Sequence, residues 1–377
     1  MSMQVSYKKQ ALLFLIFIII IFIVVEGIVR TFDVFSTTCN FVDNEIFNSY
    51  DMIEKKQMCF EYTTIKTDFS QPIRLLVPNQ NGEYININSD GFRGKNISNE
   101  KSDYRIFVVG GSTTFGFVTS SDDLTIPGIL EKKLLDDGVN VEIINAGIPG
   151  AYSRDEVYLI ENFILKFSPD MIIMYDGAND GGHSLDMITD EEFKKNNFYL
   201  NNNLITQNNT STGLLTFFAK IDFHTGIGLI QFFKSIYAPI SKENISIETE
   251  IETQEIIKLQ TERLEKNWDK VCIMGKEHQI KIVNIIQPLI GTGNRTLSDS
   301  EKLIIPSSTN FLNSLEPSTL NINSCEYVLD LRSALDETSN IPVFFDSTHM
   351  TDFGNKIVAE RIYREILPII KNDLITN

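Results

Sequence analysis

The chain has few of the residues that bind metals and nucleic acids. Its 377 residues include only 4 histidines and 4 cysteines, and these do not fall at the spacings typical of zinc sites. Lys and Arg total 33 against 50 Asp and Glu, which gives a formal net charge of −17. Because phosphate binding requires a basic surface, this charge argues against a nucleic-acid partner. No Walker-type glycine loop is present, and we expect neither a metal nor an organic cofactor.

One long apolar run stands at the N-terminus. Residues 11–29 are apolar apart from Glu26, and as a helix they would be about 28 Å long, close to the thickness of a bilayer core. Lys8 and Lys9 precede the run, which favours an N-terminus inside and the rest of the chain outside. A cleaved signal peptide is the alternative, but no clear small-x-small cleavage site follows. We therefore predict an uncleaved, single-pass membrane anchor.

The anchor divides the chain into unequal parts. We expect residues 1–10 to be a short cytoplasmic tail, 30–80 a membrane-proximal stem, and 81–377 the main domain, with an insertion or cap at 184–250. Within the insertion, Leu214–Tyr237 favours short amphipathic helices that would pack as a cap or form a lid or apolar substrate wall.

The four cysteines allow disulfides if the main domain is exported. Cys39 with Cys59 would close a short loop beside the membrane. Cys272 and Cys325 are predicted to lie at the same face of the domain, either bridged or as two buried thiols.

Strand and helix patterns alternate from residue 105 onward. Short apolar runs predict strands, and apolar residues at helical spacing predict the helices between them. Such alternation is typical of a parallel sheet with right-handed crossovers. The predicted strands are 106–109, 141–144, 171–175, 280–286 and 327–331, and the predicted helices are 124–135, 156–167, 250–274 and 352–367.

The ends of these strands carry a set of catalytic residue types. Ser112 follows the first strand, Gly147 the second and Asn179 the third, while Asp346 and His349 follow the fifth. The carboxyl ends of parallel strands share one edge of the sheet. Serine catalysis needs a base, a group that orients the base, and donors for the developing oxyanion. Taken by itself, Ser112 would more simply cap a turn after two glycines; the other strand ends favour a nucleophile.

The choice of base is narrow. His278 precedes the fourth strand and so lies at the wrong edge, whereas His183 and His224 fall in the loop and cap. His349 has Asp346 three residues before it and an amphipathic helix after it. This spacing lets the carboxylate accept from one ring nitrogen while the other faces the serine. Arg93, beside a predicted turn at Asp90-Gly91, is interpreted as a solvated side chain.

Four blocks in this order resemble those of the SGNH (GDSL-type) hydrolases. They are Gly110-Gly-Ser112, Gly147, Gly177-Ala-Asn179-Asp180 and Asp346-Ser-Thr-His349, and the likeness covers roughly residues 90–367. It implies an α/β fold of the three-layer α/β/α, flavodoxin-like kind, whose central parallel sheet has the order 2-1-3-4-5. It also implies Ser112 as nucleophile, His349 as base, Asp346 as its partner, and an oxyanion hole from Ser112, Gly147 and Asn179. Gly111 departs from the family pattern, which has aspartate there.

The resemblance implies a serine esterase or acylhydrolase that works through an acyl-enzyme. Its substrate would be an ester-bearing small molecule, lipid or glycan. Two alternatives are an O-acyltransferase acting on a surface glycan and a catalytically silent scaffold that binds a ligand or partner. The α/β-hydrolase fold is a poorer match, because Gly110-Gly-Ser112-Thr-Thr114 lacks the second glycine of its nucleophile motif.

Overall fold

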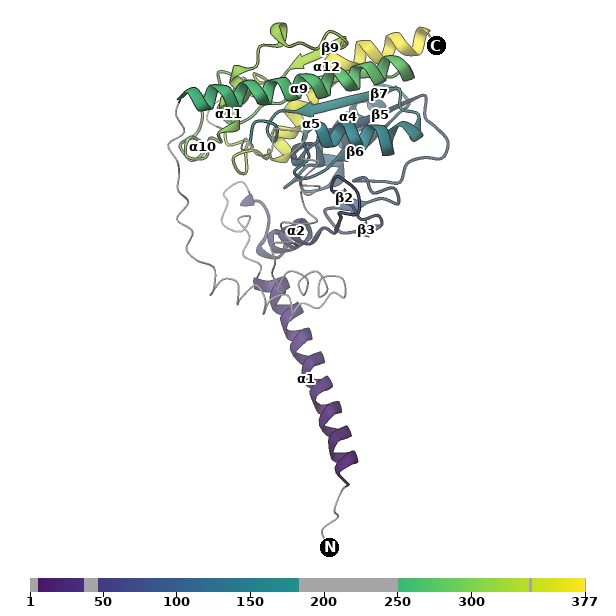
Figure 1. The fold of residues 1–377 in the computed structure, drawn as a ribbon, viewed down its shortest axis with the longest axis vertical. Helices are drawn as coiled ribbons and strands as arrows, with labels where there is room; N and C mark the ends of the chain where they lie inside the picture. Colours follow the sequence, from purple (N-terminus) through teal and green to yellow (C-terminus); the bar gives the residue numbers. More distant parts are fainter. Residues whose placement is uncertain (1–5, 37–46, 183–249, 339–340, 377) are drawn as a thin grey trace.

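A parallel sheet of five strands forms the centre of the body (Figure 1). The computed structural model describes residues 6–36, 47–182, 250–338 and 341–376. The sheet has the order β6-β5-β7-β8-β9, which confirms the predicted 2-1-3-4-5 topology. Its strands are β5 (Tyr104–Gly110), β6 (Val141–Gly147), β7 (Met171–Asp176), β8 (Lys281–Ile286) and β9 (Tyr327–Asp330).

Helices cover both faces of this sheet, as the apolar strands require. Every residue of β5, β6 and β7 is buried. On one face the core includes residues of α4 (Ile126–Asp136) and α12 (Asp352–Thr376). On the other it includes residues of α5 (Ser153–Leu159) and α9 (Glu250–His278), among them the fully buried Trp268. The result is the predicted three-layer α/β/α arrangement.

The predicted helices occur with shifted ends. The side chain of Thr125 caps α4 by accepting from the N–H of Gly128, so the helix begins at Ile126 and not at the predicted Leu124. α5 continues through a π turn, Ile160–Ile164, and a 3₁₀ turn. The remaining described elements are α2 (Met52–Thr64), β1 (Thr67–Asp68), β2 (Leu75–Leu76), β3 (Gln80–Asn81), β4 (Asn86–Ile87), α3 (Ser112–Phe115), α10 (Asp299–Lys302) and α11 (Ser308–Ser314), with 3₁₀ turns at Asp122–Leu124, Leu165–Phe167, Pro317–Thr319 and Asp336–Thr338.

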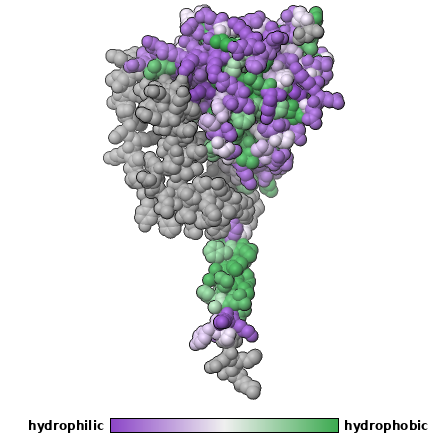
Figure 2. Space-filling view, turned by 45° about the vertical axis from the view of Figure 1, so that its right-hand side comes forward, coloured by the Kyte–Doolittle hydropathy of each residue, from purple (hydrophilic) through white to green (hydrophobic). Residues whose placement is uncertain are grey.

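An apolar helix projects from the body at the N-terminus. This helix, α1 (Tyr7–Ser36), contains a candidate membrane span, Tyr7–Ile28, with a mean hydropathy of 3.2 and no residue buried. Figure 2 shows it as a hydrophobic column below a largely hydrophilic body. Its length and composition fit a membrane anchor or a signal sequence.

From residue 47 onward, the predicted stem packs against the main body of the protein. Asp51 caps α2 through the N–H groups of Ile53 and Glu54. Met58 and Tyr62 of this helix are buried in one cluster with residues of the segment after β5, and the Phe47 ring contacts Phe345. Because these contacts join the segment to the main body, the packed domain begins before residue 81, where the sequence placed its boundary.

Two further predictions concern cysteines and the insertion. Cys272 of α9 forms a disulfide with Cys325 before β9, so the bridged alternative is confirmed. Cys59 is also disulfide-bonded, while its predicted partner Cys39 lies outside the described residues. The insertion at 184–250, with its expected helices at 214–237, also falls outside the described residues except for Glu250.

Candidate active site

Ser112 stands where β5 ends and α3 begins. β5 places its last residue, Gly110, in the centre of the sheet, between β6 and β7. Gly111 follows as the N-cap of the one-turn helix α3, whose first residue is Ser112. The side chain therefore lies at the carboxyl edge of the sheet, as predicted.

The hydroxyl, imidazole and carboxylate form a continuous chain of hydrogen bonds. Ser112 Oγ lies 2.7 Å from His349 Nε2, and His349 Nδ1 lies 2.7 Å from Asp346 Oδ2. The other carboxylate oxygen, Oδ1, accepts from the backbone N–H groups of Thr348 and His349, each at 2.8 Å. The turn before α12 thus brings base and carboxylate to the serine across 237 residues of sequence.

The ionisation state of the Asp346 carboxylate determines which ring nitrogen of His349 donates a hydrogen bond and which accepts one. Burial acts to raise the pKa of Asp346, but the hydrogen bonds and charge of His349 and the two backbone N–H groups outweigh it, and the pKa lies below its usual value. An ionised carboxylate only accepts hydrogen bonds. Nδ1 of His349 must therefore donate, which leaves Nε2 as the acceptor for the Ser112 hydroxyl.

Gly111 makes room for Asn179. A Cβ atom at Gly111 would lie 2.4 Å from Asn179 Nδ2, closer than carbon and nitrogen can approach. The Asn179 amide also donates to the carbonyl of Ala151 at 2.7 Å. The glycine that departs from the family pattern is thus matched to an asparagine amide that lies directly beside the turn that carries Ser112.

Gly147 has a different role from the predicted one. Its N–H already donates to Asn145 Oδ1 at 3.0 Å, so it is not available to an oxyanion. A Cβ at this position would lie 2.2 Å from Phe115 N, which makes glycine necessary for the close packing of β6 against α3. Among the described residues, the N–H groups of Ser112 and Gly150 have no hydrogen-bond partner. Gly150 adjoins Ala151, and hence the Asn179 amide.

Arg93 is not the solvated side chain that the sequence suggested. Its side chain is fully buried, and its guanidinium bonds to Asp122 and to the carbonyls of Phe115 and Gly116, just after Ser112. Sequence reasoning also missed Phe117, whose ring centroid lies 4.7 Å from that of His349. The only signal for Arg93 was its place between two glycines after a half-buried strand.

Buried carboxyl groups lie behind Asn179. Glu156, Asp176 and Asp180 are each at most 3% exposed. Burial raises the pKa of Asp176 to about 7, although the Trp268 N–H opposes this. Burial and the charge of Asp176 raise the pKa of Glu156 well above its usual value, and burial raises that of Asp155 to about 6. At a pH between their unfolded and folded pKa values, these carboxyl groups therefore stay protonated in the folded protein, whereas the unfolded chain releases the protons.

Glu156→Gln is expected to flatten the pH dependence of stability. When folding raises a carboxyl pKa, stability falls as pH rises from the unfolded value of about 4, and the loss continues through the folded value, about 7 for Asp176. A neutral amide removes one of the titrating groups. We expect the variant to lose less Tm than wild type between about pH 5 and 8, and to exceed wild type by about 3 °C at the upper end.

Thermal unfolding followed by circular dichroism at several pH values checks this prediction. Glu365→Gln, a change at an exposed glutamate of α12, is the control and should leave the pH dependence unchanged. Parallel Tm curves for wild type and Glu156→Gln would contradict it.

No metal site accompanies the catalytic residues. Within the described ranges, no group of three or more His, Cys, Asp or Glu side chains is arranged to hold a metal ion. Catalysis without a metal or organic cofactor stays a prediction.

A parallel sheet in this order, with a serine hydrogen-bonded to a histidine at its carboxyl edge, is the architecture of the SGNH class of esterases. The chain belongs to the GDSL-like lipase/acylhydrolase family, whose model matches residues 106–362. The protein is accordingly an ester hydrolase by family. Among curated proteins, none matches this chain.

The chain also resembles several solved structures, but less strongly than it matches the family model. An acetyl xylan esterase, AlAXEase, is 15% identical, with 70% of this chain and 99% of that chain covered and a TM-score of 0.38. A catalytic mutant of the acetylxylan esterase Axe2 from Geobacillus stearothermophilus is 12% identical, with coverage of 71% and 96% and a TM-score of 0.39. A lipase/acylhydrolase from Enterococcus faecalis is 16% identical, with coverage of 70% and 95% and a TM-score of 0.36. Family membership rests on the matched region and not on these structures.

Proposed function

We propose that the protein is a membrane-anchored serine esterase that cleaves a carboxylic ester through an acyl-enzyme on Ser112. His349 Nε2 takes the hydroxyl proton as Oγ attacks the ester carbonyl, and the same proton then passes to the departing alcohol. Asp346 holds the imidazole and stabilises its protonated form. In the second half of the reaction His349 activates water, which releases the acid and restores Ser112.

The hydrogen-bonded chain from Asp346 through His349 to Ser112 carries this proposal. Both distances are 2.7 Å, so nucleophile and base lie within hydrogen-bonding reach of each other. A scaffold that only binds a partner has no need of such an arrangement. The chain of contacts therefore favours an enzyme over a silent binding protein.

The oxyanion is assigned to three donors beside the nucleophile. They are the N–H of Ser112, the side-chain amide of Asn179 and the N–H of Gly150, which replaces Gly147 in this role. Asn179 Nδ2 uses one hydrogen on Ala151 and has a second to offer. Such donors stabilise the transition state by binding the negative charge that develops on the carbonyl oxygen.

Asn179→Ala is expected to lower kcat by about 10²–10³-fold, the usual effect of removing one oxyanion donor. KM should change little, because the donor acts on charge that develops in the transition state. Steady-state kinetics on a chromogenic ester measure both constants. Asn162→Ala, at an asparagine whose amide bonds only to Tyr158 on the neighbouring helix turn, is the matched control. A KM increase at constant kcat would instead assign Asn179 to substrate binding.

We place the catalytic domain outside the membrane, with residues 11–29 as anchor and the N-terminus inside. The exposed apolar helix α1 and the preceding Lys8 and Lys9 support this orientation. The Cys272–Cys325 disulfide supports it independently, since such bonds persist mainly in oxidising compartments.

Ester turnover by the full chain in detergent tests the proposed activity. We expect wild type to release product from chromogenic acetyl or butyryl esters without added metal or cofactor. Adding a sugar acceptor distinguishes hydrolysis from transfer, because an acyltransferase would form an acylated sugar at the expense of free acid. No turnover in either format, together with no covalent labelling of Ser112 by a phosphonate, would contradict the proposal.

A further inference from the structure

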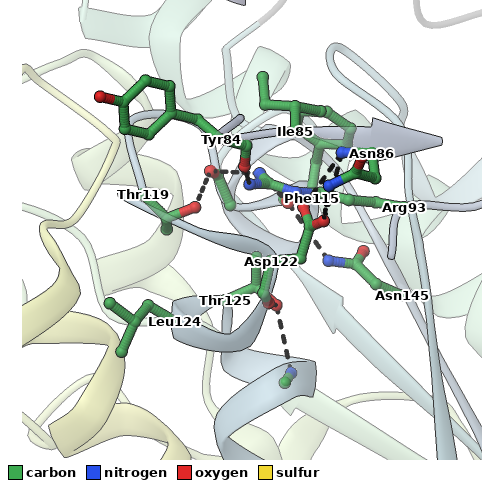
Figure 3. A network of polar contacts seen from close by, with 12 residues as sticks. Tyr84, Ile85, Asn86, Arg93, Phe115, Thr119, Asp122, Leu124, Thr125 and Asn145 are labelled. Carbon is green, nitrogen blue, oxygen red and sulfur yellow. Dashed lines mark hydrogen bonds and ion pairs between the residues drawn. The ribbon is translucent and has the colours of Figure 1, made fainter. Parts of the chain in front are cut away.

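We propose that Arg93 is a positioning residue for catalysis, which holds the backbone after Ser112 in the conformation that the nucleophile and the base both require. This inference rests on the proposed esterase function. We call residues 111–119 the nucleophile turn; it comprises the N-cap Gly111, helix α3 and the four-residue bend, 116–119, that follows the helix. Figure 3 shows Arg93 at the centre of the polar contacts that surround this turn.

The guanidinium group of Arg93 reaches the end of α3. Nη1 donates to the carbonyl oxygens of Phe115 at 2.9 Å and Gly116 at 2.8 Å. These belong to the last carbonyls of a one-turn helix, which have no intrahelical partner. Nε pairs with Asp122 at 2.7 Å and Nη2 donates to the carbonyl of Tyr84 at 2.9 Å. One planar group thus joins the turn to two other segments.

Arg93 is itself fixed to the sheet. Its backbone N–H donates to the carbonyl of Asn145 in the edge strand β6 at 3.2 Å. The side chain of the same Asn145 donates to Phe115 O at 3.2 Å. Arg93 therefore connects β6 to the nucleophile turn, near the close contact between Gly147 and Phe115 described above.

The nucleophile turn has a conformation that needs external support. Gly116 has φ +86° and Val118 has φ +68°. A β-branched residue in the left-handed region is a true outlier, and such strain persists only where surrounding contacts over-determine the backbone. Val118 is buried, and the carbonyls that bond to Arg93 come directly before it. Removing those bonds should let the bend relax.

Relaxation of the bend would reach both catalytic side chains. Ser112 precedes it, and the carbonyl of Ser112 accepts from the N–H groups of Gly116 and Phe117. The Phe117 ring packs against the His349 imidazole, with centroids 4.7 Å apart. Phe117 is therefore bonded through its backbone to the nucleophile and packed through its side chain against the base.

Tyr62 of α2 supports the same bend from the membrane-proximal side. Its hydroxyl lies 2.9 Å from Gly116 O and 2.8 Å from Thr119 O, and 3.3 Å from Arg93 Nη1. Its ring packs against Phe117, with centroids 4.9 Å apart. The segment predicted as a plain stem thus contributes a second support for the catalytic residues.

Arg93→Lys tests the proposal, because lysine keeps the charge but cannot bridge these partners with one planar group. We expect kcat and the rate of Ser112 labelling by a phosphonate to fall about 10-fold to 100-fold, as displaced catalytic groups lose rate. KM should stay within about threefold, since Arg93 is buried and does not reach substrate. Measurements use the full chain in detergent, well below the Tm of each variant.

Arg105→Lys is the matched control. Arg105 is equally buried, pairs with Glu142 through Nε at 2.8 Å, and donates to the carbonyls of Phe167 and Ser98. Arg105 belongs to β5, the strand that leads to Ser112, but it lies at the other end of that strand. We expect a comparable loss of Tm, with kcat and labelling rate within about twofold of wild type.

Tyr62→Phe covers the case in which Arg93→Lys does not fold. Loss of this one hydroxyl should lower kcat and labelling about 3-fold to 10-fold with little change in KM. Unchanged kcat and labelling in Tyr62→Phe, or equal effects of the two arginine variants at matched stability, would overturn the inference. Failure of wild type to label or turn over any ester would instead contradict the proposed function, so the two failures are distinguishable.

Discussion

Replacing Ser112 with alanine is expected to lower ester turnover by about 10⁶-fold, the effect seen when a nucleophile of this kind is removed. Within the described part of the chain, the hydroxyl hydrogen-bonded to His349 Nε2 is that of Ser112, at 2.7 Å. Residual catalysis from the oxyanion donors and substrate binding should remain above the rate in water by about 10³–10⁴-fold.

The folded state should survive this change. Ser112 is only partly buried, and its side chain contributes one hydrogen bond, to a partly exposed histidine. Steady-state kinetics with a Tm measurement check both statements. Ser347→Ala, in the turn between Asp346 and His349, is the control, since its hydroxyl contacts only Thr348 at 3.4 Å. Substantial turnover by the Ser112 variant would remove Ser112 from the mechanism.

Replacing His349 with alanine is expected to cost about as much as replacing the serine, because the two act as one unit. The imidazole is the group that accepts the Ser112 proton in this mechanism, so the double variant should be no slower than either single variant. Asp346→Asn is expected to lower kcat by a smaller factor. An asparagine can still contact Nδ1 but favours the wrong tautomer of the imidazole, and we expect a loss of about 10⁴-fold in kcat.

Kinetics of the single and double variants measure this coupling. If the effects of Ser112→Ala and His349→Ala multiplied, the two residues would act independently, contrary to the 2.7 Å contact between them. An Asp346→Asn variant as active as wild type would show that the carboxylate does not orient the base.

The sheet, and the approach of Ser112, His349 and Asp346 to one another, were predictable because they depend on local signals. Apolar runs such as residues 106–109 and 171–175 are buried strands in the structure, and the residues at their ends meet at one edge whatever the loops do. His349 and Asp346 were identifiable from their three-residue spacing before a helix, from the positions of the other histidines and from the resemblance to SGNH hydrolases.

The supports of the site were not predictable, because they depend on contacts distant in sequence. Arg93 looked solvated beside a turn, yet it is buried, and its partners come from separate segments: the carboxylate of Asp122, the carbonyl of Tyr84 and two carbonyls of the nucleophile turn. Gly147 was identified as important for the wrong reason. Its N–H has a side-chain partner two residues away, and the need for glycine comes from Phe115 of another element.

The stem illustrates the same limit. Residues 47–64 have no strong periodicity, so the sequence suggested a plain connection between anchor and domain. Tertiary packing decides otherwise, since Met58 and Tyr62 are buried against Phe115 and Val118. A short amphipathic helix is recognised only when the surface that it covers is known.

Covalent labelling of the full chain by an alkyl phosphonate, with the modified residue located by mass spectrometry, tests the central claim most directly. The reagent reports the nucleophile without requiring the natural ester. We expect one adduct per chain, on Ser112, formed by wild type and abolished by His349→Ala. A wild-type protein that forms no adduct, or forms it on another residue, would contradict the assignment of Ser112 as the nucleophile.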